Sequence, residues 1–232
     1  MRSPVGITRA LEEQTPLRTV VLDGVSARSQ SERAYLLIRD QIVTLKLRPG
    51  AVIEESRLRQ ELQLGRTPIR EALQRLAHEK LVTFVPHRGT FVTDINITDL
   101  ARLTEVRVVI EGYAARLAAE RATPEERQAM QRLQVELSAL DSDPDALIHL
   151  DQRIHRLVYR ASHNRFLEDV CERYFHLSLR LWFLALHRVH LREAVEEQRE
   201  LLDAVQSRDP ARAEAAVRRH VMGFEAQIRK VL

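Results

Sequence analysis

The chain of 232 residues contains very little cysteine, lysine or aromatic side chain. Its single cysteine, Cys171, cannot form a disulfide within the chain, which suits a reducing compartment. No apolar run approaches the roughly 18 residues that a membrane span needs, and the first residues lack the apolar core of a secretory signal. We therefore expect a cytoplasmic protein that does not associate with a membrane.

The net charge of +3 is distributed unevenly along the chain. Residues 29–92 contain 11 basic and 7 acidic side chains, whereas residues 93–232 contain 21 basic and 23 acidic ones. Arginine outnumbers lysine by 33 to 3, and its planar guanidinium group favours bidentate contacts. A mildly basic front part weakly favours a polyanionic partner such as nucleic acid.

The front of the chain has the pattern of three short helices followed by a β-hairpin. Residues 1–28 lack sustained periodicity and are predicted to be a flexible arm. Apolar residues at three- and four-residue steps predict helices from residue 31 to the stop at "LRPG", at 55–63 and at 66–79. The runs "LVTFV" and "TFVTDI", joined by "PHRG", predict two strands. Residues 29–93 should therefore form a winged helix-turn-helix domain.

The remainder of the chain, residues 97–232, shows only helical periodicity. "TPEE" has the form of a capping box, and Asp precedes Pro in "DPD" and again in "DP", which are typical helix starts. We expect a mainly α protein, with this second domain an all-α bundle of six or seven helices. The predicted spans are 98–121, 124–140, 144–161, 165–190, 192–207 and 210–230.

The third helix of a winged helix-turn-helix enters the major groove of DNA with its N-terminal end. Arg66, Thr67 and Arg70 lie at that end, where arginine can pair with both acceptors of a guanine. Arg88, at the hairpin tip, suits a contact with the minor groove or the DNA backbone. The alternatives are that these arginines form a solvated helix face, or that the winged helix is a protein-docking module.

In the second domain, polar residues interrupt the apolar stripes of several helices. A buried polar group without a partner costs a few kcal/mol, so these residues should satisfy one another or a shared ligand. Asp151 and His155 share one helix face, and His220 comes from another helix. One carboxylate and two imidazoles are ligands that hold Zn, Ni or Mn. Local hydrogen bonding within a core is the alternative.

Arg107 interrupts another stripe and could bind a carboxylate in bidentate fashion. It could equally pair with Glu111, four residues further along the same helix.

The front stretch "LRQELQLGRTPIREALQRLAHEKLVTFVPHRGTFV" resembles the GntR family of bacterial transcription regulators. Two positions depart from the family pattern: Gly65 stands where the family usually has serine, and Gln63 where it has glycine. The residues that this resemblance implies in DNA contact are Arg66, Thr67, Arg70, Ser56, Arg57 and Arg88.

Residues 98–230 resemble the all-helical FCD domain of the FadR-type branch of that family, through "EVRVVIEGYAARLAAERAT" and "LDQRIHRLVYRASHNRFL". The resemblance implies that Asp151, His155 and His220 hold a divalent metal, and that the metal and a nearby arginine hold a small carboxylate effector. Gln198 stands at the place of a third histidine and is a weaker ligand. Trp182 is predicted to line the effector site, with core packing as the alternative.

The sequence thus predicts a repressor that binds a pseudo-palindromic DNA operator as a homodimer. Its effector should be a small organic or sugar acid, with a divalent metal and no organic cofactor. One alternative is a metal-dependent, hydrolase-like enzyme with an appended winged-helix docking domain. Another is a TetR-like regulator, which the predicted wing argues against.

Overall fold

The computed structural model describes residues 27–139, 143–185, 188 and 191–231. The predicted N-terminal arm lies almost entirely outside the described residues. Contacts divide the chain into a front unit, which ends at Ile95 and also takes in Leu179–Leu184, and a rear unit of Asn96–Ser178 and Ala185–Leu232. In the described part of the chain, every helix is too short or too polar to cross a bilayer.

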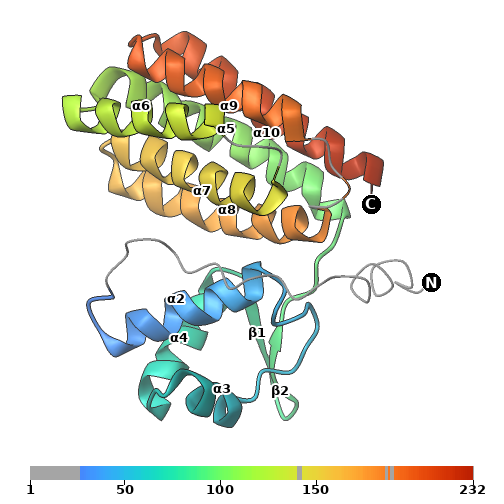
Figure 1. Cartoon of the computed structure of the whole chain (residues 1–232). Coiled ribbons are helices and arrows are strands. Elements are labelled where there is room, and N and C mark those ends of the chain that lie inside the picture. The colour runs from blue at the N-terminus through green and yellow to red at the C-terminus, as the bar shows by residue number, and fades with distance from the viewer. Residues whose placement is uncertain (1–26, 140–142, 186–187, 189–190, 232) are drawn as a thin grey trace. The chain divides into compact units, whose positions relative to one another are not determined.

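Between residues 27 and 95, the front unit consists of three helices and an antiparallel hairpin (Figure 1). Its elements are α2 (Gln30–Val43), α3 (Glu55–Leu62), α4 (Arg66–His78), β1 (Val82–Val85) and β2 (Gly89–Val92). Helices α2 and α4 pack against each other, and Ile38 of α2 and Ile69, Leu73 and Leu76 of α4 are fully buried. This is the three-helix and wing arrangement that the sequence predicts.

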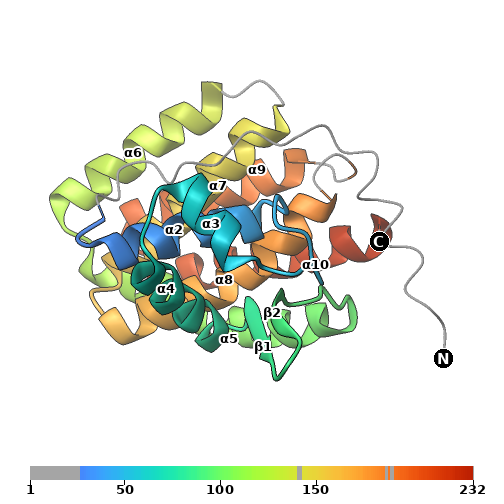
Figure 2. The ribbon, with the colours of Figure 1, turned by 90° about the horizontal axis from the view of Figure 1, so that it is seen from below.

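The hairpin pairs Val82 with Val92 and Val85 with Gly89. Gly89 has a φ of +112°, a conformation that glycine adopts without strain and that closes the turn. Figure 2 shows α3, α4 and the hairpin together on one face of the front unit, with no other described helix or strand in front of them. The recognition elements of a winged helix are thus presented on one surface.

The rear unit is a bundle of helices that lie alongside one another (Figure 1). The described helices are α5 (Thr98–Arg121), α6 (Pro124–Ala139), α7 (Pro144–Ala161), α8 (Arg165–Ala185), α9 (Leu191–Gln206) and α10 (Pro210–Val231). α10 packs against α5 and α9, and α7 packs against α5, α6 and α9. Alanine, leucine and valine side chains fill the core between them. The mainly α fold class predicted from the sequence is confirmed.

The capping box predicted at "TPEE" forms at the start of α6. The backbone N–H of Thr123 donates to Glu126 Oε2 over 2.9 Å, and the backbone N–H of Glu126 donates to Thr123 Oγ1 over 3.2 Å. Two N–H groups that the helix itself cannot satisfy are thereby bonded.

We expect Thr123→Ala to lower the free energy of unfolding by about 1 kcal/mol, because it removes one half of this box. Ser138→Ala, at an exposed position on the same helix, is the matched control and should change stability by less than about 0.5 kcal/mol. Urea denaturation followed by circular dichroism measures both. Equal effects in the two variants would show that the box contributes nothing.

Candidate DNA-binding face and buried polar cluster

The residues predicted to contact DNA are all exposed, and they lie in α3, in α4 and in the turn of the hairpin. Arg66 and Thr67 occupy the first turn of α4, and Arg70 follows one turn later. Arg88 lies in the hairpin turn. The complete set is Ser56, Arg57, Arg66, Thr67, Arg70 and Arg88.

The N-terminus of α4 is open to an anion. Gly65 is the N-cap residue, and no side chain caps the helix there. The N–H groups of the first turn are then free to bond a phosphate, and the helix dipole favours negative charge at this end. Arg70 Nε lies 3.0 Å from Glu55 Oε2 in a half-exposed ion pair. Surface pairs of this kind contribute little, so Arg70 can exchange Glu55 for a DNA phosphate or base.

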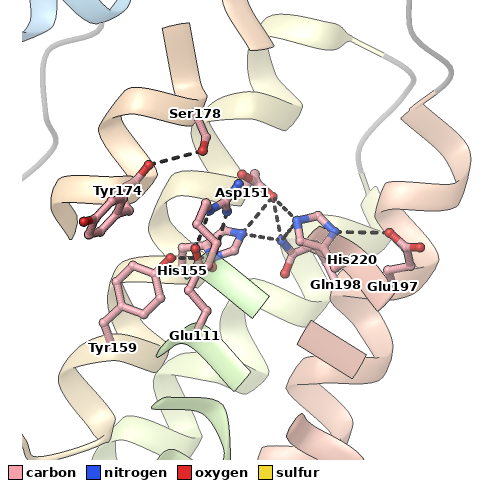
Figure 3. A network of polar contacts seen from close by, with 10 residues as sticks. Glu111, Asp151, His155, Tyr159, Tyr174, Ser178, Glu197, Gln198 and His220 are labelled. Carbon is pink, nitrogen blue, oxygen red and sulfur yellow. Dashed lines mark hydrogen bonds and ion pairs between the residues drawn. The ribbon is translucent and has the colours of Figure 1, made fainter. Parts of the chain in front are cut away.

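In the rear unit, three helices bring polar side chains to one buried point (Figure 3). Asp151 and His155 come from α7, Gln198 from α9 and His220 from α10, and none is more than 6% exposed. Asp151 Oδ1 lies 3.6 Å from His155 Nε2 and 3.3 Å from His220 Nε2. The structure therefore brings together the three residues that the sequence singles out as metal ligands, with the glutamine among them.

Each histidine ring is held from its far side by a carboxylate. His155 Nδ1 lies 3.2 Å from Glu111 Oε2, and His220 Nδ1 lies 3.2 Å from Glu197 Oε2. An ionised carboxylate can only accept a hydrogen bond, so the network places a ring proton on Nδ1 in both histidines. Both Nε2 atoms face Asp151. Metal-binding histidines are commonly oriented in this way.

A glycine, Gly223, lies beside Glu197 where α10 packs against α9. A Cβ added at Gly223 would lie 2.9 Å from Glu197 Oε1, which is closer than such atoms approach. Glycine at this position therefore leaves room for Glu197 to reach His220.

The charges of the cluster balance internally. Burial alone would lower the pKa of His220, but Asp151 and Glu197 outweigh it and raise the pKa to about 9. Burial alone would raise the pKa of Asp151, but the neighbouring imidazoles and Gln198 lower it. Asp151 is therefore an anion at neutral pH, and the positive charge of His220 lies beside it.

Two observations indicate that the cluster could hold a divalent metal ion. Its three candidate ligand atoms, one each from Asp151, His155 and His220, all lie within 4.8 Å of one another. Ligand atoms bonded at about 2.1 Å to a tetrahedral Zn²⁺ are ~3.4 Å apart, close to the 3.3 and 3.6 Å between the carboxylate and imidazole atoms. The second observation is Gln198 Oε1, which is buried without a hydrogen-bond partner among the described residues.

Arg107 is already paired within α5. Its Nε and one terminal nitrogen lie 2.5 and 3.3 Å from the two carboxylate oxygens of Glu111, and both side chains are buried. Burial alone would raise the pKa of Glu111, but the charge of Arg107 lowers it to about 2. The guanidinium also lies against the rings of Phe175 and Phe224. An entering carboxylate would have to compete with Glu111 for Arg107.

Trp182 is buried in α8, within the stretch Leu179–Leu184 that groups with the front unit. Its role beside an effector stays a prediction. The sequence did not indicate that Glu197, Tyr159 or Phe175 belongs to the site. The ring centroid of Phe175 lies 4.5 Å from that of His155. The hydroxyl of Tyr159 lies 3.0 Å from His155 Nδ1. The i+4 spacing from Asp151 to His155 to Tyr159 is the one signal that could have found Tyr159.

A winged helix-turn-helix with an open recognition helix, joined to an all-helical domain, defines the class of DNA-binding transcription regulators. Comparison with known families agrees: residues 30–92 match the model of bacterial regulatory proteins, gntR family, and residues 102–223 match the FCD domain. The chain belongs to the gntR family and carries an FCD domain.

Relatives of similar length are named as regulators. One from Streptomyces ambofaciens, an uncharacterized HTH-type transcriptional regulator in an unstable DNA locus, is 31% identical, covering 89% of this chain and 88% of its own. The E. coli K12 transcriptional repressor RspR is 25% identical, covering 87% and 90%. The solved structure of E. coli McbR/YncC has the same fold, with a TM-score of 0.78 at 22% identity over 87% of this chain and 98% of that one. The family consists of regulators rather than enzymes, so the hydrolase alternative is not favoured.

Proposed function

We propose that the protein is a repressor whose operator binding is controlled by a small carboxylate metabolite bound in the rear unit, together with a divalent metal. The observation that carries this proposal is the cluster of Asp151, His155, Gln198 and His220 inside a bundle whose core is mainly apolar. Burying polar groups lowers the free energy of unfolding unless they have bonding partners. A binding site for a metal and a ligand would account for their presence here. That RspR and the E. coli protein GlaR are named repressors supports the direction of control.

Asp151, His155 and His220 would hold the metal, and Glu111 and Glu197 would orient the two imidazoles. The metal would supply a positive charge for the effector carboxylate, with Arg107 as a second, competing partner. Effector binding would then shift the populations of the conformations that the protein samples, and so change its affinity for the operator. A homodimer would place two recognition helices about one DNA turn, ~34 Å, apart on a pseudo-palindrome. Because chromosomal DNA is the partner, we place the protein in the cytoplasm.

Selection from random duplexes with the full-length protein tests the regulator as a whole. The enriched sequence should contain two half-sites related by two-fold symmetry, and light scattering should give the mass of a dimer. An enriched site without symmetry, bound by a monomer, would contradict the homodimer proposal.

Calorimetric titration with a panel of small acids, with and without Zn²⁺, Ni²⁺ or Mn²⁺, tests the effector. We expect at least one acid to bind at least tenfold more tightly when metal is present, and to release the protein from its operator. The double variant Arg107→Met with Glu111→Gln removes both charges of the buried pair and should weaken that binding. Binding of a neutral compound alone, unchanged in the double variant, would refute a carboxylate effector.

A further inference from the structure

Gln198 occupies the point on which the candidate metal ligands converge. Its Nε2 atom lies 2.5 Å from Asp151 Oδ1, 3.3 Å from His155 Nε2 and 3.1 Å from His220 Nε2 (Figure 3). These three atoms are the candidate ligand atoms themselves. A side-chain amide has two N–H donors, so it cannot satisfy all three neighbours at once. The amide nitrogen therefore stands among the ligand atoms as a cation would, but satisfies them incompletely.

The other end of the same amide is left without a partner. Gln198 Oε1 is buried and accepts no hydrogen bond from the described residues, although buried carbonyl oxygens are normally bonded. Turning the amide by 180° about its last bond exchanges the nitrogen and the oxygen. In that orientation Oε1 would face the carboxylate oxygen of Asp151 in place of the nitrogen, and the two oxygens repel each other unless a cation lies between them.

We propose that Gln198 serves the site in two orientations: its N–H₂ group takes the place of the ion in the metal-free protein, and its carbonyl oxygen becomes a ligand when a divalent metal binds. This inference rests on the proposed metal site. It explains how the ligands can be held in place without metal, because the amide bridges α7, α9 and α10. It also sets the metal affinity, because the ion must first displace the hydrogen bond to Asp151.

The side-chain amide signal of Gln198 reports the orientation directly. In full-length protein labelled with ¹⁵N-glutamine, Gln198→Met identifies the signal by its loss. We expect the metal-free protein to show slow hydrogen exchange of this N–H₂ group, since the group is buried and bonded. Addition of Zn²⁺ should shift the signal and speed its exchange at least tenfold, because the N–H₂ group leaves Asp151.

Gln198→Glu separates the two roles in a second measurement. A carboxylate can act as a ligand but cannot donate to Asp151, so the metal-free variant should unfold at a lower temperature than the wild type. Its affinity for Zn²⁺, measured by competition with a chelator, should rise at least tenfold. A purely structural role would lower the unfolding temperature with and without metal and leave the affinity unchanged.

The outcomes distinguish this inference from the function on which it rests. If Zn²⁺ binds by competition while the Gln198 signal and its exchange stay unchanged, the two-orientation proposal is wrong and the metal site stands. If neither Zn²⁺, Ni²⁺ nor Mn²⁺ binds to the wild type, the proposed metal site fails and the inference fails with it.

Discussion

Replacing Arg66 with alanine is expected to weaken operator binding by about ten- to a hundredfold, while binding to unrelated DNA weakens far less. Arg66 is exposed in the first turn of α4, the part of a recognition helix that reaches base edges. Loss of a bidentate arginine–guanine contact costs about 1–3 kcal/mol. A non-specific duplex offers only the phosphate part of that contact.

Arg70→Ala should act in the same direction with a smaller effect, because Arg70 must first release Glu55. Arg88→Ala, in the wing, should instead weaken all sequences alike and reduce the salt dependence by about one counterion. Fluorescence anisotropy on operator and scrambled duplexes at several salt concentrations separates these cases.

Arg229→Ala is the control for a lost positive charge, because Arg229 lies on α10, paired with Glu225 at the surface. It should change operator affinity by less than about twofold, as expected for a surface charge outside the winged helix-turn-helix that salt screens. Unchanged operator binding in both Arg66→Ala and Arg70→Ala would show that α4 is not the recognition helix.

Local signals in the sequence predict the helices closely. The cap at Thr123 and the Asp143–Pro144 start place α6 and α7 where the structure has them, because capping is settled by residues within one turn. The departure at Gln63 also has a local meaning: it ends α3 with a φ of +54°, a left-handed conformation that favours the glycine of the family pattern.

The partners within the buried cluster could be predicted only in part. Helical periodicity predicts that Asp151, His155 and His220 face the core. It does not predict which helices meet there, or at which level along the bundle axis their side chains come together. Glu197 follows Glu196 in a charged stretch that looks like a solvated face. Only the packing of α10 on α9 turns Glu197 toward His220. Such contacts depend on how helices far apart in the sequence pack together, and local sequence patterns give no direct information on that packing.

Breaking the buried pair of Arg107 and Glu111 should have the largest effect on stability. We expect Glu111→Gln to lower the free energy of unfolding by about 3–5 kcal/mol, because it leaves the charge of Arg107 buried without a counter-charge. Both side chains are at most 4% exposed, so water cannot compensate. The Gln side chain keeps the shape of Glu and removes only the charge.

Two comparisons make this expectation specific. Glu225→Gln breaks an i,i+4 pair with Arg229 at the surface and should cost no more than about 0.5 kcal/mol. Adding Arg107→Met to Glu111→Gln removes the lone charge and should recover part of the loss. A double variant less stable than Glu111→Gln would mean that Arg107 stabilises the bundle by its packing on Phe175 and Phe224 rather than through its charge.

The pH dependence of stability follows from the same pair. The charge of Arg107 outweighs burial and lowers the pKa of Glu111 from 4.5 to about 2, so the unfolded chain takes up this proton at a higher pH than the folded one. The stabilisation is therefore fully present above about pH 4.5 and is lost as the pH falls toward 2. Urea denaturation of wild type and Glu111→Gln at pH 7 and pH 3 should show the difference between them shrinking at the lower pH. A difference that stays constant would mean that the loss in Glu111→Gln comes from hydrogen-bond geometry and not from charge.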